Sequence, residues 1–492
     1  MKNNLKLSTM KKSILTSVAL STIAVTAVTA TLNGCASGGS KSGSSGSSVS
    51  DTRSGYRLRD FEEKTLPNGL RILFIPDQAL PYVSLSMLIR SGSAQDPKGQ
   101  EGLASTVAEL LTKGTTKRSA TQIADDLGNM GAELDANASY DYSVVSASAL
   151  SNVSAGLLTN MLEVVTQPTF PDAEIERTRK QALAQLARLP DNADAFADLA
   201  FSSYLYGDHP YGRPAIGTPK SLADLKKKNI IQSYLRNYRP NNAILAVVGQ
   251  YSPDFRRKVE EGFGAWQQRD LPKTEWPVAA KPEGLGIRVI DYPGLVQSQI
   301  RIGTLGIQRS NKDFLALRVG NTILGGAFAS RLNDRIRKEL GLTYSIGSGF
   351  DARLEVGPFA VETFTKNATV GQTVSETLKV LEKFKTEGAT SEEVERTKGY
   401  LKGIFPASIE TPEKLAFNLM ILRHYGIPDS YLTNYISSID ALSRSEINDA
   451  MSRALDTKNI RVLVYSKASD VVPQLEPLVG AGKVEVKPAV LK

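Results

Sequence analysis

Residues that commonly bind metals or act as nucleophiles are scarce in this chain. It contains two histidines, His209 and His424, and one cysteine, Cys35. Because the histidines lie 215 positions apart, no helix turn can carry both, which excludes the zinc motifs H-E-x-x-H and H-x-x-E-H. A single cysteine excludes an intramolecular disulfide and a zinc site built from cysteines. Neither kind of zinc site can therefore form within this chain.

Cys35 follows a segment with the layout of a secretory signal. Four lysines within residues 1–12 precede an apolar stretch of small residues at 13–32. A membrane-spanning helix is the alternative, since about 20 residues can cross a bilayer. The string Leu32-Asn33-Gly34-Cys35, however, resembles the cleavage box of bacterial lipoproteins. We therefore expect residues 1–34 to be a lipoprotein signal peptide and Cys35 to carry a lipid that anchors the chain to a membrane.

The residues after Cys35 predict where the mature protein lies. Ala36 stands where an Asp would retain a lipoprotein in the inner membrane, which favours the outer membrane of a bacterial cell envelope, with the body facing the periplasm. Residues 35–56 begin with a Gly/Ser-rich run that cannot bury a core, so we expect a tether between lipid and body.

Length and composition describe a globular body of more than one domain. The chain has 492 residues, of which 41% are hydrophobic and 22% charged, enough for several packed cores. The net charge is +8, and loss of the four lysines in the signal segment would leave +4. No basic run stands out, so nucleic acid is not expected as a partner.

The body reads as a duplication. The string from Glu174 to Arg179 recurs from Glu393 at an offset of 219 residues. Ser221-Leu-Ala-Asp-Leu recurs as Ser438-Ile-Asp-Ala-Leu at an offset of 217, and an apolar strand follows in each case. Residue periodicity predicts a hairpin over 61–75, helices over 102–113, 120–130, 153–166 and 173–188, and strands over 83–90, 141–149 and 243–249.

The repeats divide the chain into two copies of one α+β unit. The predicted parts are an N-terminal half, a linker rich in Pro and charge, a C-terminal half and a tail, at residues 57–267, 268–287, 288–472 and 473–492. Two similar halves that face each other would enclose a groove, and pockets favour such interfaces.

Five strings carry a resemblance to a known family. They are TLPNGLRILFI at 65–75, EGLASTVAELLTKGT at 101–115, FPDAEIERTRKQAL at 170–183, YGDHPYGRPAIGT at 206–218 and NTILGGAFASRLNDRIRKELGLTYSIGSGF at 321–350. Together with the duplication they resemble the insulinase/pitrilysin-type metallopeptidases, the inverzincins, in their short bacterial form. The resemblance implies an α+β fold of two homologous halves. Each half would be a mostly antiparallel sheet with helices packed on one face, and the halves would face each other across a groove.

The zinc motif of this family is degenerate here. In active members the first helix carries H-x-x-E-H, whose histidines bind zinc and whose glutamate polarises the attacking water. Ser105 and Glu109 take the two histidine positions, and Ala108 takes the glutamate position. The third ligand, a glutamate on a later helix, falls at Ala184 or Gln185. The resemblance therefore implies that this chain holds no metal and that the first helix is an ordinary buried-to-surface turn.

A second part of the family's machinery is retained. Arg337 and Tyr344 match an Arg/Tyr pair that family members use to hold the substrate backbone and the reacting carbonyl. Both side chains donate hydrogen bonds suited to a carbonyl oxygen or a developing oxyanion. We expect Gly341 to end the helix that carries Arg337, so that the chain turns into a strand that carries Tyr344.

Three further features stay open or minor. The Gly325-Gly326 pair could serve close helix packing or a loop near the groove, and the sequence does not separate the two. His209 lies in the string at 206–218 that resembles the family, and we expect it to pack in the fold or cap a helix rather than bind a metal. His424 receives no role.

The resemblance leaves three interpretations of function. In the first, this chain is the non-catalytic, substrate-binding subunit of a heterodimeric zinc peptidase, whose partner carries H-x-x-E-H and the zinc. In the second, it is a catalytically dead scaffold or peptide-binding protein. In the third, which the missing ligands disfavour, it is an active zinc peptidase with rearranged ligands. We favour the first, with a chain that is inactive alone and part of a proteolytic complex.

Overall fold

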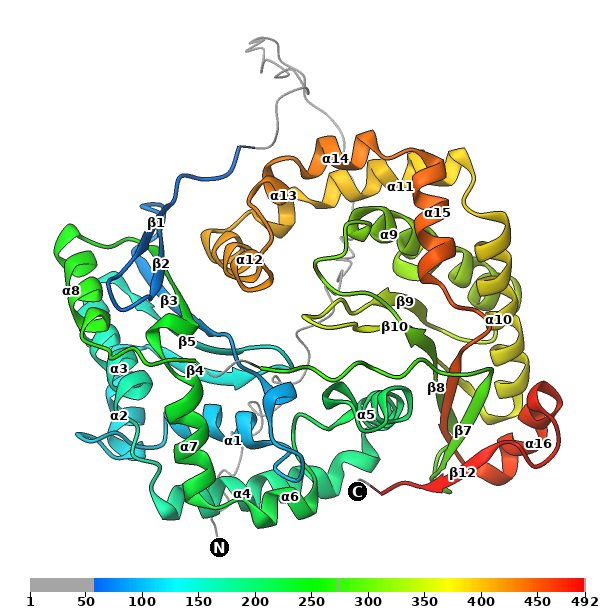
Figure 1. The fold of residues 1–492 in the computed structure, drawn as a ribbon, viewed down its shortest axis with the longest axis horizontal. Coiled ribbons are helices and arrows are strands. Elements are labelled where there is room, and N and C mark those ends of the chain that lie inside the picture. The colour runs from blue at the N-terminus through cyan, green and yellow to red at the C-terminus, as the bar shows by residue number, and fades with distance from the viewer. Residues whose placement is uncertain (1–56, 272–273, 491–492) are drawn as a thin grey trace, which may run out of the picture. The chain divides into compact units, whose positions relative to one another are not determined.

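Two six-stranded sheets organise the structure, and apart from one edge strand their strands follow the same order (Figure 1). The computed structural model describes residues 57–271 and 274–490, which belong to one compact unit, and the predicted signal peptide, Cys35 and tether lie outside the described residues. In spatial order, the first sheet consists of β1 (Glu62–Thr65), β2 (Arg71–Pro76), β6 (Ala243–Gly249), β3 (Tyr82–Ile89), β5 (Ser143–Leu150) and β4 (Glu133–Ala138). The second consists of β12 (Glu485–Pro488), β7 (Gly286–Asp291), β11 (Arg461–Ser466), β8 (Gln297–Leu305), β10 (Pro358–Lys366) and β9 (Ile346–Phe350).

The helices follow the same repeat. Those of the first half are α1 (Leu103–Leu111), α2 (Ala120–Met130), α3 (Ser154–Thr166), α4 (Asp172–Arg188), α5 (Ala193–Tyr206), α6 (Pro219–Asp224), α7 (Lys227–Asn237) and α8 (Pro253–Gly264). Those of the second half are α9 (Phe314–Asn321), the π-helical η6 (Thr322–Gly326) and η7 (Asn333–Glu339), α10 (Val370–Glu387), α11 (Ser391–Ile404), α12 (Pro412–Tyr425), α13 (Ser430–Thr433), α14 (Tyr435–Ala441), α15 (Arg444–Ala454) and α16 (Ala468–Val479).

The strand pairing confirms the predicted α+β fold of two similar halves. β2 pairs with β6 in parallel, as β7 does with β11, and the pairs that follow along each sheet are antiparallel. The predicted hairpin is also confirmed, since β1 and β2 pair antiparallel around the turn at 66–70. The halves differ at one edge, where the hairpin strand β1 is replaced by β12 from the C-terminal end, in parallel to β7.

The strand β12 corrects the expectation of a tail. Residues 473–492 include the end of α16 and the whole of β12, so most of this segment belongs to the second half. The four-residue strand is largely exposed and lacks the apolar alternation that identifies a strand in a sequence.

Both faces of the central strands are buried. In β6, Ile244 and Ala246 face a core shared with α12, whereas Leu245 and Val247 face the helices of their own half. Because neighbouring side chains of a strand point to opposite faces, a strand buried on both faces reads as a continuous apolar run, as AILAVVG does.

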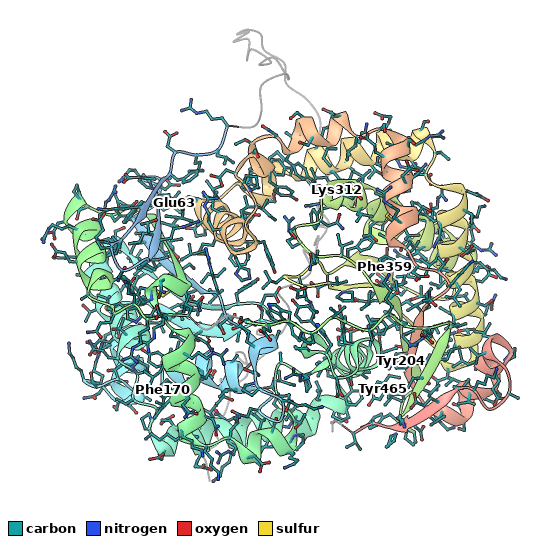
Figure 2. All side chains as sticks on the ribbon, in the orientation of Figure 1. Glu63, Phe170, Tyr204, Lys312, Phe359 and Tyr465 are labelled. Carbon is teal, nitrogen blue, oxygen red and sulfur yellow. The ribbon has the colours of Figure 1, made fainter. Side chains whose placement is uncertain are left out.

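The second apolar face of each sheet is covered by a helix from the other half. α12 packs on β6, β2 and β3 of the first sheet, and α5 packs on β11 and β8 of the second (Figure 1). Figure 2 shows Tyr204 of α5 and Tyr465 of β11 on these neighbouring elements, and the ring of Phe196 stacks on Tyr465 at 4.8 Å. Helices were expected on one face only, and this exchange covers the other face as well.

Polar contacts of buried side chains join the halves, among them those of Arg301 and Asp141. Arg301 on β8 is 2% exposed and pairs with Asp194 and Asp198 on α5, at 2.5 and 2.6 Å. Asp141 lies just before β5 and is 4% exposed. Its carboxylate accepts hydrogen bonds from the Tyr211 hydroxyl at 2.6 Å, the Tyr425 hydroxyl at 3.0 Å and the Leu354 N–H at 2.8 Å. The last two donors belong to the second half.

Candidate functional site

Arg337 lies in η7, a π-helical segment that follows the Ser330-Arg331-Leu332 string. The wider winding is visible where the Leu340 N–H donates to the Arg335 carbonyl, five residues back, at 3.1 Å. π-Helical turns are uncommon and are found frequently at functional sites. Arg331 has a structural role, because it forms a bidentate ion pair with Glu393 and donates a hydrogen bond to the Gly388 carbonyl.

Tyr344 lies in a tightly held segment between η7 and β9. Gly341 ends the helical stretch with a φ of 61°, as predicted, and this left-handed conformation favours glycine. Hydroxyls of two β10 threonines then hold the segment, since Thr365 donates to the Leu342 carbonyl and Thr363 to the hydroxyl of Thr343. Tyr344 therefore precedes β9 rather than lying within it, which corrects the predicted strand position.

Arg337 and Tyr344 lie side by side. The guanidinium carbon of Arg337 is 5.0 Å from the ring centre of Tyr344 and 4.6 Å from that of Phe328. Tyr344 is 76% exposed and Phe328 64% exposed. Within residues 57–271 and 274–490, neither Arg337 nor Tyr344 forms a hydrogen bond or ion pair, so both keep their donors free for a ligand. The pair can thus offer a planar cation and a phenol to the same carbonyl group.

Phe328 also belongs to this exposed site, although the sequence did not identify it as a site residue. It lies two residues beyond Gly325-Gly326, between small residues and outside any apolar periodicity. The one sign of its role in the sequence is a large ring where no core pattern requires one.

The two glycines Gly325 and Gly326 have a packing role. A Cβ on Gly325 would lie 2.4 Å from Ser348 Oγ, and one on Gly326 would lie 3.0 Å from Asn321 Nδ2.

The positions of the degenerate zinc motif lie on α1 and use their polar atoms locally. Ser105 Oγ donates to the Ala215 carbonyl at 2.7 Å, and Ala108 is fully buried. Glu109 is exposed and pairs with Lys113 one helical turn further on, at 3.0 Å. The segment therefore offers one hydroxyl already in use and one surface carboxylate, a poor donor set for zinc.

The expected third position adds no ligand to this set. Ala184 and Gln185 are exposed on α4. Across the part of the chain that the structure describes, no three His, Cys, Asp or Glu side chains gather as a metal site would require. None of the described hydrogen bonds, ion pairs or ring contacts links the α1 positions to Arg337 or Tyr344.

The two histidines are packed into the body. His209 Nδ1 accepts from the Tyr211 N–H at 3.1 Å and Nε2 lies 3.0 Å from the Pro277 carbonyl, which is the capping role that the sequence favoured. His424, on α12, packs edge-to-face with Tyr142, with 5.5 Å between the two ring centres. Both of its nitrogens are buried and have no partner among the described residues. Burial, reinforced by the charge of Arg90, lowers the pKa of His424 to about 4.

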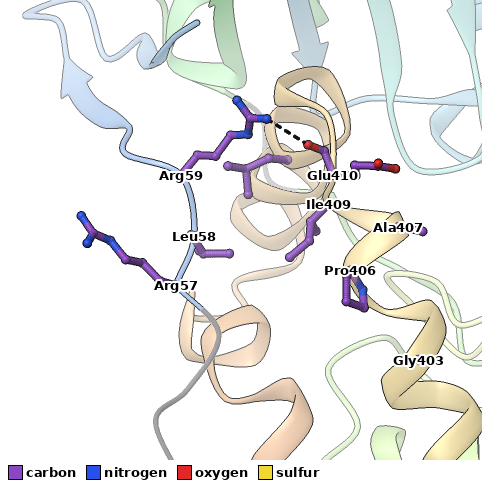
Figure 3. A pocket seen from close by; sticks show the side chains of 9 residues that line it. Arg57, Leu58, Arg59, Gly403, Pro406, Ala407, Ile409 and Glu410 are labelled. Carbon is purple, nitrogen blue, oxygen red and sulfur yellow. Dashed lines mark hydrogen bonds between the residues drawn. The ribbon is translucent and has the colours of Figure 1, made fainter. Parts of the chain in front are cut away.

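Two surface hollows lie away from these residues. One, of about 610 Å³, is lined by Asn241, Gln268, Arg269 and Asp270 at the start of the predicted linker. The other, of about 380 Å³, lies where the described chain begins (Figure 3). There Leu58 packs against the second half, and Arg59 bonds both the Asp77 carboxylate at 2.8 Å and the Glu410 carbonyl at 3.4 Å. The first described residues thus bridge the two halves.

No helix among the described residues combines the length and the apolar character needed to cross a bilayer.

Comparisons with known protein families, sequences and structures identify the proteins that this chain is similar to. Residues 71–219 match Insulinase (Peptidase family M16), and residues 224–401 match the Peptidase M16 inactive domain. The uncharacterized zinc protease YmxG of Bacillus subtilis is 25% identical over 83% of this chain and 98% of its own length. An uncharacterized zinc protease of Mycobacterium tuberculosis is 31% identical over 69% of this chain and 78% of its own length. A crystal structure titled as a peptidase M16 inactive domain, from Pseudomonas fluorescens, is 26% identical, with a TM-score of 0.76 over 83% of this chain and 98% of that one. This chain therefore belongs to peptidase family M16, the insulinase family.

Proposed function

We propose that this chain is the non-catalytic, substrate-binding subunit of a two-chain zinc peptidase. The observation that carries the proposal is the contrast between its two candidate sites. Arg337 and Tyr344 lie together, exposed and with free donors, whereas the α1 positions offer no ligand set for zinc. A chain that keeps peptide-holding groups and lacks metal ligands fits a complex in which the zinc belongs to a partner that carries H-x-x-E-H.

In this proposal the chain holds the peptide while the partner hydrolyses it. Arg337 would donate its planar N–H groups to the peptide backbone, and Tyr344 would donate its hydroxyl to the carbonyl that is attacked. Such donors stabilise the negative charge that develops on the oxygen, and loss of one typically costs about 100- to 1,000-fold in rate. The partner's zinc would supply the activated water. No step of hydrolysis is assigned to α1 of this chain.

The experiment measures peptide cleavage by the reconstituted pair. Tyr344→Phe should lower turnover by about 100-fold or more, and Arg337→Ala should also weaken peptide binding because it removes a charge. Tyr400→Phe and Arg396→Ala, on the surface of α11 in the same half, are matched controls that should behave as wild type. Gel filtration checks that each variant still assembles with the partner.

The scaffold interpretation is the second candidate, favoured by the likeness to a structure titled as an inactive domain. It predicts that both site variants assemble normally and keep full turnover. That result would replace the shared-site proposal with a structural or peptide-binding role.

We further propose that Cys35 carries a lipid that anchors the chain in the outer membrane, facing the periplasm, with residues 35–56 as a tether.

A further inference from the structure

Phe328 is exposed in a loop that the structure holds rigidly. It lies between η6 and η7, and 64% of its surface is open to water. One exposed apolar ring is common on its own, but Phe328 shares the Arg337 guanidinium with the exposed ring of Tyr344, and neighbouring exposed rings can mark an interaction site.

Close packing and hydrogen bonds fix this loop. Gly325 lets the backbone of the loop approach Ser348 more closely than a side chain would permit, and a Cβ on Gly326 would make a tight contact with Asn321. Asn321 and Ser348 then bond each other twice, through Asn321 Nδ2 to the Ser348 carbonyl at 2.9 Å and Ser348 Oγ to Asn321 Oδ1 at 2.7 Å. On the other side, Asn333 Nδ2 donates to the carbonyl of Ala327, next to Phe328, at 3.3 Å. The exposed position of the ring is therefore built into the fold.

The ring lies within a cluster of cations and a second exposed ring. The Arg337 guanidinium lies over both Phe328 and Tyr344, at 4.6 and 5.0 Å from their centres. The Lys338 ammonium is 5.5 Å from the Phe328 centre and is paired with Asp334 at 2.6 Å. Two aromatic rings thus flank Arg337, and cation–π attraction holds the guanidinium between them. An aromatic or apolar side chain brought to this surface would remove both rings from water.

We propose that Phe328, together with the ring of Tyr344, forms a specificity surface for an aromatic or large apolar side chain of the bound peptide. The proposal rests on the proposed function, because the peptide is the one whose carbonyl Arg337 and Tyr344 hold. Phe328 contributes preference for a side chain, and Arg337 contributes affinity for any peptide backbone. The two contributions can be measured separately.

The test measures peptide binding by the purified mature chain, without a partner. The probes are two fluorescein-labelled synthetic peptides of equal length that differ only at a central Phe-Phe or Ser-Ser, followed by fluorescence anisotropy. The wild-type chain should bind the Phe-Phe peptide about tenfold more tightly, as expected for partial burial of apolar rings. Phe328→Ser should abolish this preference, so that the two peptides bind with equal affinity. Phe328→Tyr, which keeps a ring, should retain the preference. Leu80→Ser, which alters a 70% exposed apolar residue of the other half, should have no effect.

The outcomes separate this inference from the proposed function. Arg337→Gln should weaken binding of both peptides equally. If it binds both like wild type while Phe328→Ser loses the preference, the Arg/Tyr role fails and the apolar surface stands. If Phe328→Ser keeps the wild-type preference, the specificity surface is wrong. Absence of any preference or of any binding by the wild type also overturns it, as does self-association of the chain that Phe328→Ser abolishes, since the surface would then bind a second copy.

Discussion

The buried carboxylate of Asp141 makes a strong prediction about how the halves are held together. It accepts three hydrogen bonds, two of them from donors of the second half, Tyr425 and Leu354. The third donor, Tyr211, itself accepts from the N–H of Glu355 at 3.0 Å. Burial raises the pKa of Tyr211 and of Tyr425, and the charge of Asp141 raises both further, so both phenols stay protonated and donate.

The structure sets the size of the effect of Asp141→Ala. Hydrogen bonds to a charged group contribute about 1.5–3 kcal/mol each, and loss of the acceptor leaves the buried Tyr211 hydroxyl and the partly buried donors of Tyr425 and Leu354 unpaired. Removal of a buried charge recovers part of its desolvation cost, so we expect a net loss of about 4 kcal/mol in the free energy of unfolding. For a folded unit of roughly 430 residues the entropy of unfolding is about 0.9 kcal/mol/K, which converts this loss to a fall of about 4 °C in Tm.

The assay is thermal unfolding followed by calorimetry, with circular dichroism as a second probe. Asp141→Asn keeps one acceptor and should lose about half as much. Asp135→Ala, at an exposed position of the edge strand β4, is the control and should stay within about 0.5 kcal/mol of wild type. If Asp141→Ala unfolds like this control, the carboxylate does not hold the halves together, and the reasoning from its three bonds is refuted.

Three further outcomes are expected. Elemental analysis of the purified mature chain should find no stoichiometric zinc, because Ser105 and Glu109 together form a poor donor set; one tightly bound zinc per chain would contradict this. Cys35→Ser should release the protein from membranes or leave its precursor uncut, and unchanged fractionation with unchanged mass would count against lipidation. His424 has a pKa near 4 when folded and 6.5 when unfolded, so between these values the unfolded chain binds a proton that the folded chain does not. Lowering the pH through this window should therefore reduce the free energy of unfolding by about 1.4 kcal/mol per unit more than in His424→Gln, and parallel pH profiles would disprove it.

Much of the fold could be predicted because its signals are local. The apolar runs of β6 and β11 and the helical periodicity of α1 to α4 depend on neighbouring residues alone. The exchange of α5 and α12 could not be predicted in this way. Each helix has apolar residues suited to any sheet face, and which sheet it covers depends on contacts between residues far apart in the sequence. β12 escaped prediction for the same reason, since its pairing with β7 alone identifies it as a strand.

In the candidate site, too, the features that depend on a local motif could be predicted and those that depend on tertiary contacts could not. Arg337 and Tyr344 were found through a motif, and the structure places them together. The turn before Tyr344 was missed because it depends on the hydroxyls of Thr363 and Thr365, which lie on a later strand. Phe328 was missed because its exposure follows from tertiary packing of its loop, and a sequence does not distinguish an exposed phenylalanine from a buried one.

The exchanged helices have a consequence for how the chain acquires its structure during synthesis. The first sheet is complete once β6 has emerged, yet its second apolar face stays open until α12 follows, roughly 160 residues later. α5 likewise waits for β8 and β11, so neither half can close its core before nearly the whole chain is present. Folding dominated by such distant contacts is slow and exposes apolar surface to aggregation. A chain cut between the halves should therefore yield two insoluble fragments when each is produced alone, and a folded pair only when both are produced together.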